Sequence, residues 1–429
     1  MYNSHLVLPL LSRIVNLISS LFVGLVLAAY FGPHHYGFIT VVLTLLSFFR
    51  PITLLGLSNT LPIMSINHSE STYFYSSIVC YMGISAVISA LLIFLVNYQF
   101  NGLLGYYGEM LIYFIPVYFL FSLQYLFRHF YETKFLFSKL YAIDIFGVVF
   151  SSLVKLCFVY FKVDFHLFLL VIVFENLLFA FMYVYFYGFP KFRHTNFIVS
   201  KILKSSFPFI LSSLSIILYM KVDILMIDFY MTKESVGLYG FSSRLVESIL
   251  VFPALAVSVV YPYLVKSFKS LSSTDRISIY VVGFSACIVT IAIVFILLVN
   301  IVSFLFPEFE FINTYIWLSL LSIPFATVSM ISYKYHIING KAWMMTPSFV
   351  IACLFNILLN SIMIPKYGLI GAAASTVMSQ FFIAFIYDLF FDDLKTIGFE
   401  KILMLTRLFH PSIYSARNVK QLYWKIFKQ

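Results

Sequence analysis

The stretch PFILSSLSIILYMKVDILMIDFY (208–230) decides the fold class, because it is long and apolar enough to cross a bilayer and yet contains Lys221 and Asp223. A membrane-spanning helix needs roughly 20 mostly apolar residues, and this stretch supplies them. A charged side chain at the centre of such a helix costs about 2.5–3.5 kcal/mol on insertion scales. The stretch therefore predicts a transmembrane helix whose charges belong either to a structural pair or to a polar cavity inside the membrane.

The rest of the chain has the same apolar character. Of its 429 residues, 62% are hydrophobic and 10% are charged, whereas soluble domains usually carry about 25% charged residues. We therefore expect an all-α integral membrane protein. The sequence has no GxxxxGK[ST] loop and no HExxH, CxxC or GxSxG motif. We accordingly expect a protein that is not an enzyme and that holds no metal and no cofactor.

About twelve segments satisfy the length and hydropathy requirement for a span. They divide into an N-terminal and a C-terminal group of six, which predicts two pseudo-symmetric six-helix bundles around a central cavity. The predicted spans are 6–30, 37–62, 75–97, 109–130, 140–161, 166–188, 206–230, 236–264, 278–300, 313–333, 346–365 and 368–391.

Basic residues between the spans predict the orientation of the chain. With both termini in the cytoplasm, the outer loops contain only Lys162, Lys233 and Lys366, and most other loop Lys and Arg are inside. This bias accounts for the net charge of +10 without a nucleic-acid partner. The basic tail is expected to lie on anionic membrane lipids.

A weak internal repeat supports the division into two halves. VFENLLFAFMYVYFY (173–187) lies over VMSQFFIAFIYDLFF (377–391), and Leu11-Ser12 matches Leu211-Ser212. We expect an N-terminal bundle at 1–190, a basic cytoplasmic linker at 191–205, a C-terminal bundle at 206–391 and a basic cytoplasmic tail at 392–429.

Charged residues deep in the predicted spans are the candidate functional residues. Asp223 is expected to pair with Arg244, and Lys221 is expected to face a water-filled cavity together with Arg13 and Arg50. The alternative is that these charges are structural pairs between neighbouring helices. The deep cations exceed the deep anions by one, which favours a cavity for an anionic cargo; they are Arg13, Arg50, Lys155, Lys221 and Arg244, against Asp144, Glu175, Asp223 and Glu247.

Several stretches resemble the polysaccharide-transporter branch of the multidrug/oligosaccharidyl-lipid/polysaccharide (MOP) exporter superfamily, and within it the Wzx-type O-antigen flippases. The most specific of them is PFILSSLSIILYMKVDILMIDFYMTKESVGLYGFSSRLVESILVFP (208–253), a seventh span with an internal Asp followed by a short turn. The others are FGPHHYGFITVVLTLLSFFRPITLLGLSN (31–59), INGK (338–341) and IPKYGLIGAAASTVMSQ (364–380). The resemblance covers about residues 6–391, and its motifs are loose patterns of apolar and small residues.

The resemblance implies an alternating-access flippase for an undecaprenyl-pyrophosphate-linked sugar repeat unit, which moves from the cytoplasmic to the periplasmic leaflet of the bacterial inner membrane. It implies Arg13, Arg50, Lys221 and Arg244 as cavity cations. Asp223 matches the seventh-span acid of the family, and from their depth in the spans we expect coupling or charge pairing of Asp223, Glu247, Asp144 and Glu175. The repeat-unit polymerase and the chain-length regulator are the implied protein partners.

The sequence leaves several alternatives open. The driving force is a proton gradient, a sodium gradient or the membrane potential, and the glycan is O-antigen, capsule or another surface polysaccharide. The competing functions are a cation-coupled drug exporter of the same superfamily and a non-transporting membrane protein of glycan assembly.

Overall fold

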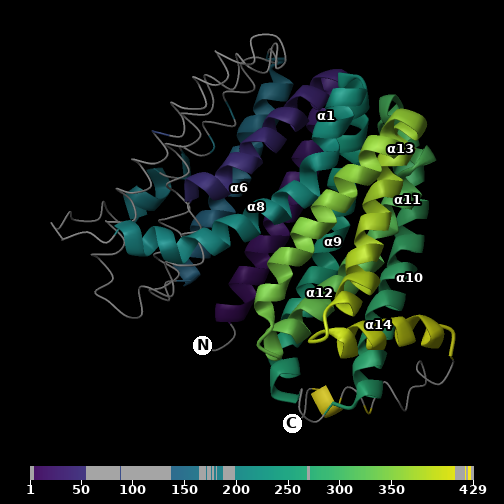
Figure 1. The fold of residues 1–429 in the computed structure, drawn as a ribbon. Helices are drawn as coiled ribbons and strands as arrows, with labels where there is room; N and C mark the ends of the chain where they lie inside the picture. Colours follow the sequence, from purple (N-terminus) through teal and green to yellow (C-terminus); the bar gives the residue numbers. More distant parts are fainter. Residues whose placement is uncertain are drawn as a thin grey trace. The chain divides into compact units, whose positions relative to one another are not determined.

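A computed structural model of the chain describes residues 4–54, 87, 137–163, 171, 175, 178–179, 181–186, 199–267, 271–410, 421 and 424–426 (Figure 1). Within those ranges every regular element is a helix, as the apolar composition predicts. The chain divides into two compact units, residues 1–217 and residues 218–429. The division falls inside the helix α8 (Val199–Tyr230). The segment 191–198 of the expected linker lies outside the described residues, so the predicted boundary stays a prediction.

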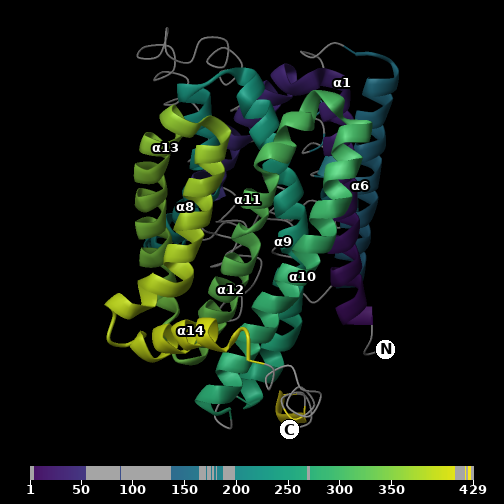
Figure 2. The same ribbon diagram turned by 90° about the vertical axis from the view of Figure 1, so that its right-hand side faces the viewer.

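In the first unit, the long helices α1 (Ser4–Leu54) and α6 (Phe137–Tyr160) pack side by side (Figures 1 and 2). α1 contains the first expected span, 6–30, and the described part of the second, 37–54; the two are separated at Gly32, whose φ of 69° and ψ of 172° are not helical. A positive φ is readily adopted only by glycine, which explains why the turn occurs at this residue. The expected spans 75–97, apart from residue 87, and 109–130, and most of 166–188, lie outside the described residues.

The second unit begins with the end of α8 and continues through a series of long helices joined by short connections. They are α9 (Lys233–Ser267), α10 (Ser273–Leu305), α11 (Ile316–Leu320), α12 (Ser322–Ile338) and α13 (Met345–Phe381). Short 3₁₀ turns, η2 (Pro307–Thr314) and η3 (Ala342–Met344), precede α11 and α13. After α13 follow the π-helical turn η4 (Phe382–Ile386), the 3₁₀ turn η5 (Tyr387–Phe390) and the helix α14 (Lys395–Arg407).

α13 folds back on itself in the middle, so that it supplies the last two expected spans. The reversal occurs at Gly368, with φ 57° and ψ −134°. Just beyond it, a Cβ atom on Gly371 would lie 2.2 Å from the carbonyl oxygen of Met363. The neighbouring Ala372 and Ala373 are fully buried. Small side chains therefore allow the two arms of α13 to approach closely.

Seven helical stretches in the described part of the chain are long and apolar enough to cross a membrane. Two of them, Leu11–Phe48 and Met345–Phe390, each overlap a pair of expected spans. Large apolar side chains project outward along them, for example Ile293 and Ile296 of α10, which are 58% and 65% exposed. Such exposure in a long apolar helix is what a lipid-facing surface requires. The protein is a multi-pass membrane protein.

Candidate functional site

A partly open pocket lies within the second unit, where α8, α9, α11, α12 and α13 converge. Its lining from α9 follows helical spacing, so one face of this helix forms a wall. The lining is unusually polar for the interior of apolar spans. It comprises Tyr219, Met220, Asp223, Tyr239, Ser243, Val246, Glu247, Leu250, Ser319, Ser322, Thr376 and Gln380. We refer to it as the Asp223 pocket.

Asp223 is the buried acid of this pocket, with a relative exposure of 6%. The hydroxyl of Tyr239 donates a 2.6 Å hydrogen bond to Oδ2, and the backbone N–H of Ile224 donates a 2.9 Å bond to Oδ1. The hydroxyl oxygen of Tyr239 also lies 3.3 Å from Oγ1 of Thr376. One carboxylate and one phenol thus link α8, α9 and α13. Hydrogen bonds from such donors stabilise a charge that is removed from water.

The expected ion pair between Asp223 and Arg244 is wrong, because Asp223 takes its hydrogen bonds from Tyr239 and Ile224 instead. Arg244 lies half-buried on α9. A tyrosine hydroxyl can satisfy the carboxylate oxygen at short range without bringing a second charge into the span, which avoids the desolvation of a guanidinium.

Lys221 is not a spare cation in this structure, contrary to expectation. Its Nζ lies 2.5 Å from Oε1 of Glu247, and the two side chains are 26% and 40% exposed. The pair joins α8 to α9 next to the Asp223 pocket, to which Glu247 contributes part of the lining. Because both groups are partly exposed and Glu247 lines the pocket, we expect the pair to contribute little to stability.

The first unit contains a similar arrangement on α6. Nζ of Lys155 lies 2.7 Å from Glu175, which also accepts a 2.8 Å hydrogen bond from Ser151. Asp144 is buried and accepts a 2.8 Å hydrogen bond from the hydroxyl of Tyr183. In each unit, therefore, one deep glutamate pairs with a lysine and one deep aspartate accepts from a tyrosine.

The two remaining candidate cations both lie on α1. The side chain of Arg13 is exposed. Arg50 belongs to the helical backbone near the end of α1, and its side chain lies outside the described part of the structure. Their assignment as cavity cations stays a prediction.

Tyr239 and Thr376 are site residues that sequence reasoning missed. Tyr239 lies in the VGLYGFSS segment (236–243) of the stretch quoted above. The sequence contains 31 tyrosines, however, and its pattern does not distinguish Tyr239 from tyrosines that face lipid or the membrane interface. Helical spacing offered a usable signal, since Tyr239 and Glu247 are eight residues apart and share a face.

In the described ranges, no group of three His, Cys, Asp or Glu side chains is placed to hold a metal ion. The buried polar residues behind the pocket are amides and hydroxyls. Nδ2 of Asn360 donates to Asn356, and Nδ2 of Asn356 donates to Ser379, at 2.9 and 3.3 Å. The bond from Asn356 to Ser379 joins the two arms of α13, and the bond from Asn360 orients Asn356 within the first arm.

Comparison with known proteins places the chain in a family. The sequence model of the family described as polysaccharide biosynthesis protein matches residues 5–268. No curated protein matches the chain.

Solved structures share the fold at low sequence identity. The lipid II flippase MurJ in an inward closed conformation aligns with a TM-score of 0.75 and 16% identity, over 99% of this chain and 95% of that one. An inward-facing multidrug resistance MATE transporter of the MOP superfamily aligns with a TM-score of 0.66 and 12% identity, over 94% and 96%. The MATE transporter ClbM aligns with a TM-score of 0.54 and 12% identity, over 99% and 96%. These likenesses confirm the predicted fold class.

Proposed function

The chain belongs to the polysaccharide biosynthesis protein family, and from this premise we propose that it is a flippase for a lipid-linked surface-polysaccharide repeat unit. The cargo is an undecaprenyl-pyrophosphate-linked O-antigen unit or a similar glycan. It moves from the cytoplasmic to the periplasmic leaflet of the bacterial inner membrane by alternating access. The observation that carries the proposal is the family match over 5–268, on a chain with the fold of the MOP transporters.

The chemistry of this cargo explains why charges are kept inside the spans. A pyrophosphate and a sugar cannot enter hydrocarbon without partners, because their hydrogen-bonding groups would be left unsatisfied. Cationic side chains bind phosphate oxygens through charge-assisted hydrogen bonds. We assign this role to Arg13, Arg50, Lys221 and Arg244.

The contact between Lys221 and Glu247 adds a step to this proposal. In the described structure the ammonium of Lys221 is held by Glu247. An arriving pyrophosphate would compete with the carboxylate for that ammonium. Exchange of partners would release Glu247 and loosen the connection between α8 and α9, so that cargo binding and helix movement are linked.

Asp223 is the residue to which we assign coupling. Its carboxylate connects three helices through Tyr239 and Thr376. Binding of a proton or a sodium ion at this carboxylate would change those contacts and bias one conformation over another. The driving ion itself is left open between a proton, sodium and the membrane potential.

The Asp223 pocket also supports a second candidate, a cation-coupled exporter of small molecules in the same superfamily. The pocket contains two carboxylates, and Lys155 and Lys221 are each neutralised by a glutamate. The pairing leaves the surplus of one cation unchanged, but it occupies two of the cations on which the preference for an anionic cargo partly rests.

Deletion of the gene separates the two candidates. The flippase proposal predicts that lipid-linked repeat units accumulate on the cytoplasmic leaflet and that long surface polysaccharide disappears, with restoration by a plasmid copy. Normal long-chain polysaccharide in a strain without a paralogue would overturn it. The exporter candidate predicts normal polysaccharide and increased sensitivity to cationic drugs.

A further inference from the structure

The helix α14 (Lys395–Arg407) has 13 residues and is therefore too short to cross a bilayer. One of its faces is nevertheless buried in the second unit. Ile397 and Met404 belong to the same hydrophobic cluster as Tyr280 of α10 and Tyr335 of α12. Between them, Glu400 is 2% exposed and Lys401 is fully buried. Because the inner face of α14 buries both charged and apolar side chains, this helix is packed firmly against the other helices of the second unit.

Two ionic contacts fix this inner face. Nζ of Lys401 lies 2.7 Å from Oδ2 of Asp388, the carboxylate that also contacts Ser332 and His336 of α12. Burial lowers the pKa of Lys401 from its ordinary value, and Asp388 opposes that shift.

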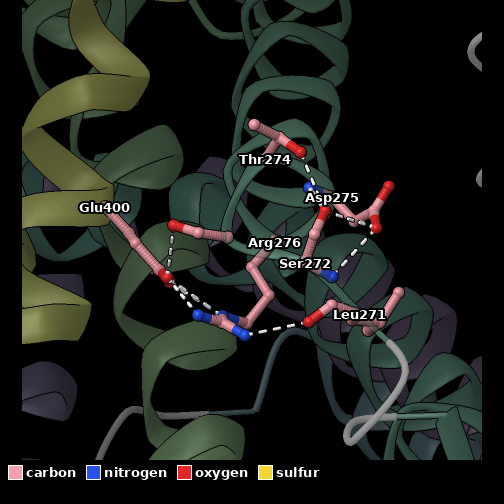
Figure 3. Close-up of polar contacts among 7 residues, drawn as sticks. Leu271, Ser272, Thr274, Asp275, Arg276 and Glu400 are labelled. Atoms are coloured by element: carbon pink, nitrogen blue, oxygen red, sulfur yellow. Dashed lines mark hydrogen bonds and ion pairs between the residues drawn. The ribbon is translucent and has the colours of Figure 1, made fainter.

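The second contact joins α14 to the start of α10 (Figure 3). Nε of Arg276 donates to both oxygens of Glu400 at 3.0 Å, and Ser273 donates to Oε1 at 2.8 Å. The guanidinium also donates to the carbonyl oxygen of Leu271 at 3.1 Å. The single acidic residue of α14 is thereby neutralised on the inside.

The partners of α14 define its level along the bundle. Ser273 and Arg276 lie in the first turn of α10, and Ser332 and His336 lie in the last two turns of α12. α14 thus packs beside the ends of these spans, and Figures 1 and 2 show it running crosswise to α10 and α13 there. This is the level at which a membrane-spanning helix passes from acyl chains to headgroups.

The outer face of α14 exposes the apolar side chains of Phe399, Ile402 and Leu403, and Phe409 is exposed just beyond the end of the helix. Their relative exposures are 58%, 37%, 45% and 92%. Contiguous apolar surface of this kind marks an interaction site. By sequence, the segment 392–429 carries more basic than acidic residues, a net charge that suits an anionic surface even though Lys401 is buried on the inner face; the basic ones are Lys395, Lys401, Arg407, Arg417, Lys420, Lys425 and Lys428, and the acidic ones are Asp392, Asp393 and Glu400.

We propose that the outer face of α14 is a membrane-docking surface that inserts at the headgroup–acyl boundary of an anionic lipid leaflet. The helix lies in the interfacial plane, with its inner face held by the bundle and its outer face covered by lipid. Amphipathic helices bind bilayers in this way through buried apolar area and attraction to anionic headgroups. The surface is separate from the Asp223 pocket and does not depend on which cargo is transported.

Tryptophan depth measurements on the full chain test the proposal. The three native tryptophans are replaced by Phe, and Phe399→Trp or Leu403→Trp is introduced. The purified protein is placed in nanodiscs of phosphatidylethanolamine and phosphatidylglycerol with or without dibrominated acyl chains. We expect brominated lipid to reduce the fluorescence of both variants, and equally that of Ile293→Trp, a reference on the exposed face of α10.

Asn339→Trp supplies the matched control, because Asn339 is exposed in the turn that follows α12. Its fluorescence should respond to aqueous iodide and not to brominated lipid. If the Phe399→Trp and Leu403→Trp variants behave like this control, the outer face of α14 contacts water and the proposal is overturned. If neither quencher acts on them, a protein surface covers the helix, which also overturns it. Size-exclusion profiles matching the parent verify that each variant is folded.

Discussion

Tyr239 on α9 donates a 2.6 Å hydrogen bond to Asp223 on α8, so the buried acid of the Asp223 pocket is satisfied by a phenol and not by an arginine. The hydrogen-bond partner of this carboxylate is uncharged, so the acid is held inside an apolar span without an ion pair of its own. It also gives the acid a structural role that can be separated from any role in transport, because the hydroxyl and the carboxylate can be altered independently.

Tyr239→Phe removes the donor and leaves Oδ2 of Asp223 buried without it. We expect a loss of about 1–3 kcal/mol of stability, the usual result of leaving a buried acceptor unsatisfied. Thermal aggregation of the purified protein in detergent and its membrane abundance measure the effect. Tyr219→Phe is the control, since the buried hydroxyl of Tyr219, on the same helix as Asp223, has no hydrogen-bond partner in the described part of the chain. Equal losses in both variants would contradict the assigned role of the Tyr239 bond.

Asp223→Asn tests the proposed role of Asp223 in coupling separately from its role in stability. The amide oxygen can accept from the backbone N–H of Ile224, and the amide NH2 can donate to the hydroxyl oxygen of Tyr239, whose own hydrogen can turn to Thr376, so we expect abundance close to that of the parent. It can neither take up a proton nor carry a charge, so transport should be lost. Asp223→Ala should lose abundance as well. A strain with Asp223→Asn that retains normal surface polysaccharide would remove Asp223 from the coupling mechanism.

We expect loss of the contact between Lys221 and Glu247 to reduce transport but not stability. Partly exposed pairs contribute about 0–1 kcal/mol, so the double variant Lys221→Ala/Glu247→Ala should remain abundant. Transport should fall, because a phosphate partner and the exchangeable contact are both gone. The control pair is Lys233 with Asp228, an ion pair on the same two helices near their connecting turn. If Lys233→Ala/Asp228→Ala reduces surface polysaccharide equally, Lys221 has no special role.

Topology gives a further test that is independent of the site. A reporter that is active only in the cytoplasm should be on after Lys201 and off after Lys233, because Lys201 lies in the first turn of α8 and Lys233 follows its end. Activity after both positions would mean that α8 does not cross the membrane.

The fold class was predictable from the sequence because it follows from long apolar segments and glycine turns. Gly32 and Gly368 separate pairs of spans where the apolar runs are interrupted. The partners of the deep charges were not predictable in the same way. Asp223 and Arg244 were matched by charge alone, whereas the structure uses the nearer hydroxyl of Tyr239. Lys221 and Glu247 lie on neighbouring helices, and their contact depends on how α8 and α9 are rotated, which the apolar pattern of lipid-facing helices does not determine.

Leaflet transfer in proteoliposomes tests the central claim most directly. Purified protein is reconstituted with an undecaprenyl-pyrophosphate-linked repeat unit that carries a fluorescent sugar, and an impermeant reagent destroys the label in the outer leaflet. We predict that the parent protein exposes the protected inner-leaflet label to the reagent, whereas Asp223→Asn at equal abundance leaves it protected. The same vesicles are also tested under a proton gradient, a sodium gradient and a membrane potential. If the inner-leaflet label stays protected in vesicles with folded parent protein under all of these conditions, the proposal that this chain is a flippase is contradicted.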